Sequence, residues 1–353
     1  MKFLVIQQKM IGDVLTSTVI CESLKHYFPN AEVHLVANEN TLAVLERNPF
    51  IDTVIVFKNE FRSNKKAFFT FLKSLKKTKY TATLDAYGKL ESNLITLFSE
   101  ADKKIGNYKW YTSFIYSHKI HQKKDSNGHI PLSISNRLML LDALVKGNTF
   151  VSYPKIYLSE DEIKEAQKSI KEHIAVGNSK LIMIGILGSA PYKTYPARYM
   201  AQILDSICEK EHVKLLFNYI PKQKEEAMAI YDLCKPHTQR CIAIDFYAAS
   251  LRGFMALLSQ CDMLIGNEGG AVNMAKALDI PSFAIFSPYV NKGGWHGDVY
   301  QTHNTVHLRD FHPELFLGMD KNEIKKNSAS LYEAYKPQLF EASLLQFMAH
   351  KPV

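Results

Sequence analysis

With 353 residues, the chain is long enough for two domains that each have a full-sized core. Its 46% hydrophobic and 22% charged residues are ordinary for a soluble globular protein, and no apolar run approaches the ~18 residues of a membrane-spanning helix. The formal charge of +8 favours a polyanionic partner, which could be nucleic acid, an anionic membrane surface or a phosphorylated substrate. A merely solvated basic face is the alternative.

The N-terminus has neither the long apolar core nor the cleavage site of a signal peptide, so we expect a cytoplasmic protein. Five cysteines are scattered through the chain without a CxxC pair. This spacing predicts buried, reduced thiols and neither disulfides nor a metal site.

Short apolar runs alternate with helical segments through the first half of the chain. Strands are predicted at 2–7, 32–37, 53–57 and 82–85, and helices at about 9–28, 41–48, 65–77 and 130–145. This alternation is typical of a parallel sheet with crossover helices. No GxGxxG follows the first strand, so a nicotinamide site has no support.

The second half repeats this pattern after a linker near 147–154. Ser159 and Glu162 form a capping-box signature for a helix that ends near residue 173. Strands are predicted at 181–187, 214–218, 241–244 and 283–286, and helices at 197–211, 224–234, 251–260 and 271–278. We therefore predict an α/β protein of two doubly wound, Rossmann-like domains that face a cleft.

The predicted N-terminal domain spans 1–152, and the predicted C-terminal domain spans 153–335. The last segment, 336–353, is predicted as a C-terminal helix that could pack back on the N-terminal domain.

The stretch GNEGGAVNMAKALDIPSFAIFSP, at 266–288, is predicted as a loop, a helix and a short buried strand. A strand–glycine–helix step leaves unpaired backbone N–H groups at the helix start, where a phosphate can bind. An ordinary tight turn between strand and helix is the alternative.

Asp13 follows a glycine at the predicted end of the first strand. Ligands of open parallel sheets bind outside the carboxyl ends of the strands, so this carboxylate could take a proton from an acceptor hydroxyl. Asp is also a good helix N-cap, and its position alone favours that role.

The loop 188–196 occupies the corresponding strand end of the second half. Ser189 and Lys193 could hold a diphosphate there, although a surface lysine is the simpler interpretation. Glu225 or Glu226, at the start of a later helix, could accept hydrogen bonds from a ribose or could serve only the helix dipole.

Four motifs occur in order: IGDVLTST, LDAYGKLESN followed by KKIG, GS-x-x-x-K-x-Y-P, and EGGAVNMAKALDIP. Together they resemble the family-nine glycosyltransferases, the bacterial heptosyltransferases of lipopolysaccharide core assembly, over roughly residues 1–288. The resemblance implies a GT-B fold in which the N-terminal domain binds the acceptor and the C-terminal domain binds the nucleotide sugar. It also implies an ADP-heptose donor, inversion of the anomeric centre and no metal or other cofactor.

Residue by residue, the resemblance implies that Asp13 is the general base and that Lys193 contacts the donor phosphates. Glu225 corresponds to the ribose-contacting acid, with Glu226 a nearly equal match. The implied donor-binding residues are Gly188, Ser189, Lys193, Thr194, Glu225, Glu268, Gly269, Gly270 and Asn273. The implied acceptor-binding residues are Lys9, Gly12, Asp85, Tyr87 and Ser92.

The sequence departs from the family pattern at several of these places. The usual Asp-(Ser/Thr)-Gly-x-x-His begins here with Glu268, one methylene longer, and ends with Asn273. Lys9 stands where an arginine is expected and Tyr195 where a tryptophan is expected. Backbone N–H groups can still supply a phosphate site, whereas the identity of the donor sugar is less fixed.

These observations predict a cytoplasmic glycosyltransferase, peripheral at the inner membrane, that acts on a glycolipid acceptor. Another nucleotide sugar, or a nucleotide-sugar-binding protein without turnover, is the alternative. A nucleic-acid partner is not expected, because the basic runs at 58–79 and 103–124 contain no RNA-binding motif. We assign an anionic membrane surface to the lysines Lys65, Lys66, Lys73, Lys76, Lys77 and Lys79.

Overall fold

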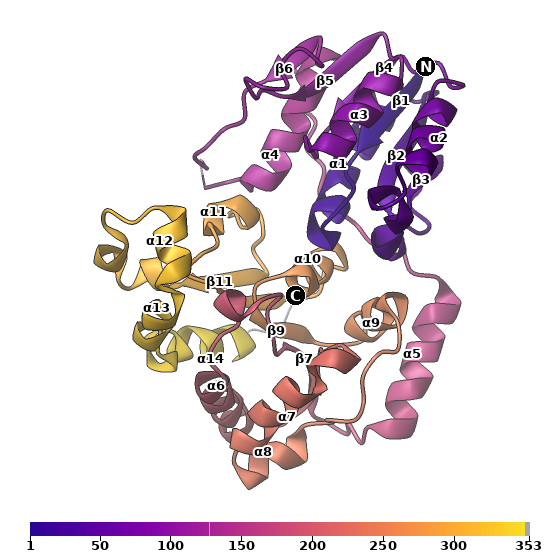
Figure 1. Cartoon of the computed structure of the whole chain (residues 1–353). Helices are drawn as coiled ribbons and strands as arrows, with labels where there is room; N and C mark the ends of the chain where they lie inside the picture. Colours follow the sequence, from indigo (N-terminus) through magenta and orange to yellow (C-terminus); the bar gives the residue numbers. More distant parts are fainter. Residues whose placement is uncertain (127, 350–353) are drawn as a thin grey trace. The chain divides into compact units, whose positions relative to one another are not determined.

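The chain divides between Tyr157 and Leu158 into two units in this computed structural model, which describes residues 1–126 and 128–349. Each unit carries one parallel sheet flanked by helices (Figure 1). The boundary lies slightly later than 152/153, because the segment before it still packs on the first unit. There Phe150 stacks on His26 with ring centroids 3.9 Å apart, and the Ser152 hydroxyl donates to the Val19 carbonyl.

The first unit contains a six-stranded sheet in the order β3-β2-β1-β4-β5-β6 within the described residues. The pairs are parallel, with Phe3 of β1 opposite Val33 of β2 and Ala82 of β4. The strands are β1 (Lys2–Ile6), β2 (Glu32–Asn38), β3 (Thr53–Phe57), β4 (Ala82–Asp85), β5 (Lys103–Asn107) and β6 (His118–Ile120).

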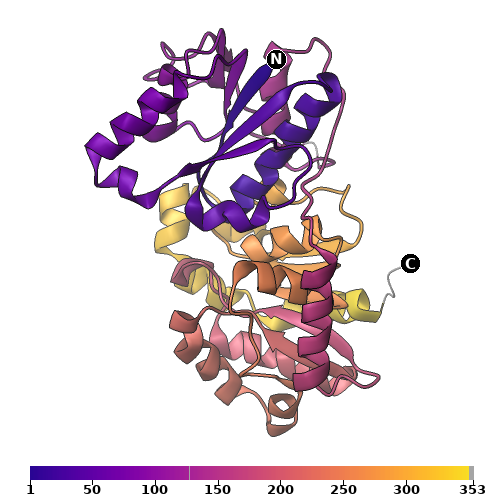
Figure 2. The same cartoon turned by 90° about the vertical axis from the view of Figure 1, so that its right-hand side faces the viewer.

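Helices cover both faces of this sheet (Figures 1 and 2). Leu4 and Ile6 of β1 pack with Leu72 of α2 (Lys65–Leu75) and Ile95 of α3 (Leu90–Phe98). Alternate side chains of β1 point to the other face, where α1 (Ile11–Tyr27) and α4 (Leu132–Leu138) pack against each other. Such burial on both faces explains the continuous apolar run of β1.

The second unit contains a five-stranded parallel sheet in the order β11-β10-β9-β7-β8, again within the described residues. Its strands are β7 (Lys180–Gly185), β8 (Val213–Phe217), β9 (Met263–Asn267), β10 (Ser282–Phe286) and β11 (His303–His307). Its helices are α5 (Glu160–His173), α6 (Ala197–Lys210), α7 (Lys224–Leu233), α8 (Pro236–Cys241), α9 (Leu251–Leu258), α10 (Gly270–Ala277), α11 (Lys292–Trp295), α12 (Lys321–Lys326), α13 (Ser328–Ala334) and α14 (Glu341–Ala349).

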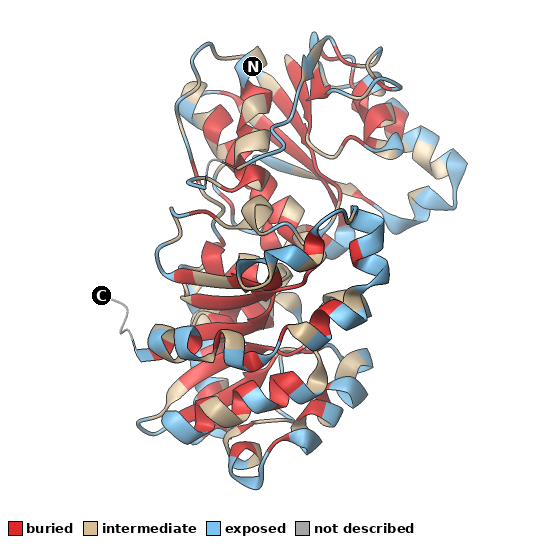
Figure 3. Cartoon of the chain, turned by 90° about the vertical axis from the view of Figure 1, so that its left-hand side faces the viewer, coloured by how far each residue is buried: buried red, intermediate tan, exposed pale blue. Residues whose placement is uncertain are grey.

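The core of this unit also takes in the C-terminal segment. Phe340, Leu344 and Met348 belong to one buried cluster with Ile182 and Ile184 of β7. The expected packing of 336–353 on the N-terminal domain is therefore corrected for the described residues, because α14 buries its apolar side in the second unit. Figure 3 shows buried strands in each unit and exposed residues on helix faces and loops.

Three predicted elements differ in the structure. The segment 41–48 forms a 3-10 helix at Glu39–Val44, because Pro49 disfavours helical geometry in the residue before it and the chain turns at Arg47, whose φ is 60°. The helix at 130–145 shortens to α4 and continues as a 3-10 helix, Met139–Ala143. The strand at 241–244 is wrong: α8 ends at Cys241, and Ile242 makes one isolated bridge to Leu215.

Other local predictions are confirmed. Ser159 and Glu162 form the capping box of α5, and Glu162 also pairs with Arg252, which holds the pKa of that carboxyl down to about 2. All five cysteines are free, and four of them are buried. Among the described residues, no helix combines the length and apolar character needed to cross a bilayer.

The strand orders fix where ligands can bind. In the first sheet the chain builds outward from β1, to β2 on one side and β4 on the other, and in the second sheet from β7 to β8 and β9. Ligands of doubly wound sheets bind at such switch points, outside the carboxyl ends of the strands. The loops after β1, β4, β7 and β9 are therefore the candidate site segments, two in each unit.

Candidate functional site

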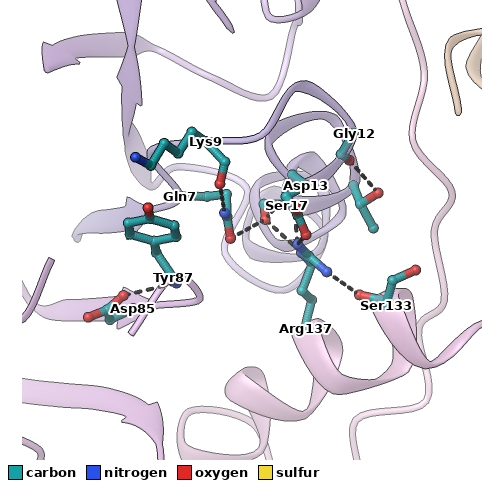
Figure 4. Close-up of polar contacts among 10 residues, drawn as sticks. Gln7, Lys9, Gly12, Asp13, Ser17, Asp85, Tyr87, Ser133 and Arg137 are labelled. Atoms are coloured by element: carbon teal, nitrogen blue, oxygen red, sulfur yellow. Dashed lines mark hydrogen bonds and ion pairs between the residues drawn. The ribbon is translucent and has the colours of Figure 1, made fainter. Parts of the chain in front are cut away.

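Asp13 lies in the first turn of α1, just after the carboxyl end of β1. Its carboxylate Oδ1 pairs with Nη2 of Arg137 at 2.8 Å (Figure 4). The N-cap position of α1 is Met10, and no side chain caps the helix. The alternative that Asp13 is a helix N-cap is therefore wrong, since its carboxylate binds a guanidinium of α4.

Arg137 is held on several sides. Its Nε donates to the Ser17 hydroxyl at 2.7 Å, its Nη1 donates to the Ser133 carbonyl at 2.7 Å, and its Nη2 also reaches the Asp13 carbonyl. Burial lowers the pKa of this guanidinium, while the charge of Asp13 raises it. A planar donor fixed in this way orients the Asp13 carboxylate. The Arg137 side chain is 11% exposed and that of Asp13 is 33% exposed, so the carboxylate keeps access to a ligand.

Sequence interpretation missed Arg137. The available signal was a single basic side chain in the apolar segment NRLMLL of the predicted helix 130–145. A buried cation in an amphipathic helix needs an anionic or polar partner, but the partner's identity came only from the packing of α1 on α4.

Lys9 and Asp13 follow the carboxyl end of β1, and Tyr87 follows that of the adjacent parallel strand β4 (Figure 4). Lys9 is half-buried, and its carbonyl accepts a hydrogen bond from Gln7 Nε2 at 2.7 Å. Gly12 is buried, and its carbonyl accepts from Thr16 Oγ1. Burial raises the pKa of the half-buried Tyr87, to which the charge of Asp13 also contributes. The structure thus gathers Lys9, Asp13 and Tyr87 at the β1/β4 switch point.

Asp85 and Ser92 have a different place from the one expected. Asp85 is fully buried, and its Oδ1 accepts from the backbone N–H groups of Tyr87 and Gly88 at 3.0 and 2.8 Å. Its Oδ2 accepts from the Tyr116 hydroxyl at 2.8 Å. Ser92 is buried as well and accepts from the Lys89 N–H. Direct acceptor contact by these two side chains is corrected to a structural role: they shape the loop that carries Tyr87.

The second unit places Gly269 and Gly270, from the stretch 266–288, at the start of α10, after β9. The Asn273 N–H donates to the Gly269 carbonyl at 3.3 Å, and the N–H groups before it face out of the helix start. A Cβ on Gly269 would meet no atom within 4 Å, and one on Gly270 would only touch the Met274 methyl at 4.0 Å. Gly269 is extended, with φ of 163°, a conformation that any residue can adopt. Neither glycine is therefore needed here to avoid backbone strain. The open space can instead admit a phosphate.

Hydrogen bonds within the loop after β7 hold its conformation. The Thr194 hydroxyl accepts from the Gly188 N–H at 3.1 Å and donates to the Ala190 carbonyl at 3.0 Å. A Cβ on Gly188 would lie 2.2 Å from the Lys193 carbonyl oxygen, so this close approach requires glycine. Asn267, at the end of β9, accepts from the Tyr195 N–H at 2.7 Å and joins the two loops. Ser189 is exposed and Lys193 is half-buried beside them.

Glu268 lies between two positive charges. Burial raises the pKa of its carboxyl, and Lys193 and Lys276 oppose that rise. Its Oε2 is buried without a hydrogen-bond partner in the described residues. A buried carboxylate oxygen of this kind is suited to a hydroxyl of a bound ligand, which would satisfy it.

Lys276 is a second residue that sequence interpretation missed. Burial lowers its pKa to about 7, while Glu268 raises it. Its Nζ donates to the Trp295 carbonyl at 2.7 Å and lies 4.5 Å from the Tyr300 ring centroid. Lys276 thereby ties the segment around α11 to α10. The signal was a lone charge in the apolar helix at 271–278.

The remaining expected donor residues are exposed or half-exposed. Glu225 and Glu226 both lie in the first turn of α7, on the surface. Asn273 is half-buried on the first turn of α10. The loops after β7 and β9 meet at the switch point, whereas α7 follows the neighbouring strand β8.

A metal site has no candidate in the part of the chain that the structure describes. No group of three or more His, Cys, Asp or Glu side chains lies close enough together there to hold an ion. Independence from metal remains a prediction about the reaction.

Two α/β units, each with a parallel sheet and with its candidate loops at a switch point, define the GT-B class of glycosyltransferase fold. Solved structures of this class share the fold of the chain. The glycosyl transferase family 9 protein of Veillonella parvula matches with a TM-score of 0.73 at 18% identity, covering 94% of this chain and 97% of that one. The ADP-heptose lps heptosyltransferase II of E. coli matches with a TM-score of 0.69 at 16% identity, covering 95% and 99%.

The family itself follows from the sequence comparison. The model of glycosyltransferase family 9 (heptosyltransferase) matches residues 68–296, more than half of the chain. The chain belongs to glycosyltransferase family 9 and is a glycosyltransferase. It is 22% identical over 297 residues to lipopolysaccharide heptosyltransferase 1 of Campylobacter coli, which covers 81% of this chain and 84% of that protein.

Proposed function

We propose that this glycosyltransferase moves heptose from ADP-heptose to a hydroxyl of a lipopolysaccharide-core glycolipid, with inversion and without a metal ion. The names of its relatives support this substrate class: besides the Campylobacter protein, lipopolysaccharide heptosyltransferase 3 of E. coli is 21% identical over 287 residues. A structural neighbour with a TM-score of 0.70 is the E. coli heptosyltransferase WaaC with ADP.

The observation that carries the proposal is the start of α10. Outward-facing N–H groups, open space at Gly269 and Gly270, and the half-buried Lys193 on the adjoining loop suit a diphosphate. The same groups would stabilise the negative charge that builds on the diphosphate as it leaves.

The acceptor end of the reaction requires a base. In the proposed step the acceptor hydroxyl oxygen bonds to the anomeric carbon, the bond from that carbon to the diphosphate oxygen breaks, and ADP departs. The hydroxyl proton goes to the Asp13 carboxylate, which Arg137 holds in one orientation at 2.8 Å. Attack on the face opposite the diphosphate inverts the configuration.

The donor has a second candidate: a nucleotide sugar other than ADP-heptose. Glu268 is one methylene longer than the family's usual aspartate, and its Oε2 lacks a partner in the described residues. The Glu268 carboxylate would therefore lie at a different distance from a sugar hydroxyl than the carboxylate of the usual aspartate. Asn273, in place of histidine, changes a second side chain of the same turn.

The test is a transfer assay with purified protein, ADP-heptose and a heptose-free core acceptor. We expect ADP release together with an acceptor that gains one heptose, at an unchanged rate in a metal chelator. A panel of nucleotide sugars tests the donor. Binding of ADP-heptose without release of ADP would indicate a non-catalytic binding protein and contradict the proposal.

A glycolipid acceptor places the proposed reaction at the cytoplasmic surface of the inner membrane. The lysines of α2 support an electrostatic contact with anionic lipids, because Lys65, Lys66 and Lys73 are all exposed. The neighbouring Phe68 and Phe71 pack against the core cluster of the first unit, whereas Phe69 is 48% exposed beside the lysines.

A further inference from the structure

The loop after β5 exposes an unusual set of large apolar side chains. Trp110 is 79% exposed, Phe114 is 82% exposed and Tyr111 is 56% exposed. The Trp110 and Tyr111 rings touch edge to face at 5.6 Å, and neither ring inserts into the core. Exposed aromatic side chains that gather in one place mark an interaction surface. We name residues 108–116 the aromatic loop.

The aromatic loop is anchored at both ends. Lys109 Nζ donates to the Gly88 carbonyl at 2.6 Å near its start. At its end the buried Tyr116 donates from its hydroxyl toward Asp85 Oδ2 at 2.8 Å and Asn93 Oδ1 at 2.7 Å. Its ring fills the space over Gly106, where a Cβ would lie 2.2 Å from it. The buried Asp85 thus helps to hold the exposed rings in place.

Along the sequence, the aromatic loop lies in a segment whose charged side chains are all basic. Residues 103–124 contain six lysines and no Asp or Glu. Three of these lysines direct Nζ to backbone carbonyls: Lys103 to Ala143, Lys104 to Leu97 and Lys109 to Gly88. These contacts leave the positive charge uncompensated by a carboxylate.

We propose that the aromatic loop is a membrane anchor that inserts Trp110 and Phe114 into the interface of an anionic bilayer while the surrounding lysines bind lipid headgroups. Trp and Tyr favour the boundary between headgroups and acyl chains, and basic side chains beside them attract anionic lipids. The anchor's rigid attachment lowers the entropy lost on insertion.

The position of the aromatic loop fits the acceptor chemistry, a point that rests on the proposed function. The Lys109–Gly88 hydrogen bond ties it to the segment that carries Tyr87, at the carboxyl edge of the first sheet. A bilayer held at this edge would present a membrane-embedded acceptor to the same loops. The charged surface of α2 would add to the attraction, but it exposes fewer apolar side chains for insertion.

The chain's two tryptophans, Trp110 and Trp295, allow a direct test. In the W295F variant, Trp110 is the only tryptophan. With vesicles of phosphatidylcholine and phosphatidylglycerol that contain no acceptor, we expect its fluorescence to shift to the blue and to be quenched by lipids brominated on the acyl chains. The W110F variant, which keeps only Trp295, should show neither change. Unchanged Trp110 emission at saturating vesicle concentration overturns the proposal.

A sedimentation experiment complements the fluorescence. W110A/F114A should weaken vesicle binding by about tenfold or more, because binding strength scales with the apolar area inserted. L317A removes a comparably exposed apolar side chain of the second unit, 80% exposed, and should leave binding unchanged. Equal losses in both variants, or a response of Trp110 to single-stranded RNA and not to vesicles, would contradict a membrane anchor.

The two proposals can fail separately. W110A/F114A should still bind ADP, and it should still transfer sugar to a detergent-dispersed acceptor. Insertion of Trp110 without any sugar transfer would refute only the proposed function, whereas sugar transfer without insertion would refute only the anchor.

Discussion

Gly270→Val is the sharpest test of the donor site, because the structure separates its effect on binding from its effect on folding. The new Cβ would meet only the Met274 methyl at 4.0 Å, and the residue opens α10 without positive φ. We therefore expect the melting temperature to stay within a few degrees of the parent.

Binding should change much more than stability. The same open space is where the outward N–H groups would meet a diphosphate, and two added methyl groups would hold the phosphate away from them. A hydrogen bond to a charged group is worth about 1.5–3 kcal/mol, so losing one such bond weakens ADP affinity about 10- to 100-fold.

Calorimetric titration of ADP into the parent, Gly270→Val and Asn273→Ala measures this difference. Asn273→Ala removes a side chain further along the same turn and should cost less affinity, and Asn273→His, which restores the family's usual residue, should be tolerated. A folded Gly270→Val that binds ADP with parental affinity would mean that the phosphates lie elsewhere.

Three further outcomes follow from charges. Lys193→Ala should reduce both ADP affinity and turnover by an amount on the order of 1.5–3 kcal/mol, and unchanged values would remove it from the donor site. Burial lowers the pKa of Lys276 from 10.5 to about 7, so this lysine destabilises the fold fully below pH 7 and progressively less as the pH rises toward 10.5. Lys276→Met should therefore raise the melting temperature most at pH 6. A gain that does not depend on pH would contradict this. Lys→Glu changes at Lys65, Lys66 and Lys73 should weaken binding to anionic vesicles by ~1 kcal/mol each at low salt, and insensitivity to salt would argue against an electrostatic contact.

The sequence predicted the central strands well because these strands are buried on both faces. β1 and β7 are apolar runs that are buried along almost their whole length, and the structure confirms them within a residue or two. Two edge strands and the interior strand β5 (Lys103–Asn107) escaped prediction. β6 (His118–Ile120) and β11 (His303–His307) are short and polar, which is how the edge strands of a sheet avoid further pairing.

The candidate site was predicted as a set of segments but not as a set of contacts. Motifs placed Asp13, Tyr87, Lys193 and Gly270 just after the carboxyl ends of predicted strands, where parallel sheets bind ligands. The order of the strands, and with it the two switch points, came only from the structure. Burial could not be inferred in the same way. Asp85 ends a strand as a ligand-binding carboxylate would, but its loop folds back and uses both of its oxygens.

The sequence also could not identify the interaction partners that come from distant segments. Arg137 is 124 residues from Asp13, and Trp295 is 19 residues from Lys276. A single buried charge signals that a partner exists, since an unpaired buried charge is costly, but its identity depends on how helices pack.

The Asp13–Arg137 pair allows the base and its support to be distinguished. Asp13→Asn keeps the shape and removes the proton acceptor, so turnover should fall roughly 10²–10⁴-fold with little change in ADP affinity. Arg137→Lys keeps the charge but loses the planar guanidinium that also binds Ser17 and Ser133. It should therefore lower turnover less than Asp13→Asn does. It should also make the rate depend more strongly on the structure of the acceptor. If Arg137 acts only through Asp13, adding Arg137→Lys to Asp13→Asn should reduce turnover no further. Full additivity of the two losses, with both variants folded, would show that Arg137 acts independently of the Asp13 carboxylate and would refute its assignment as a positioning residue.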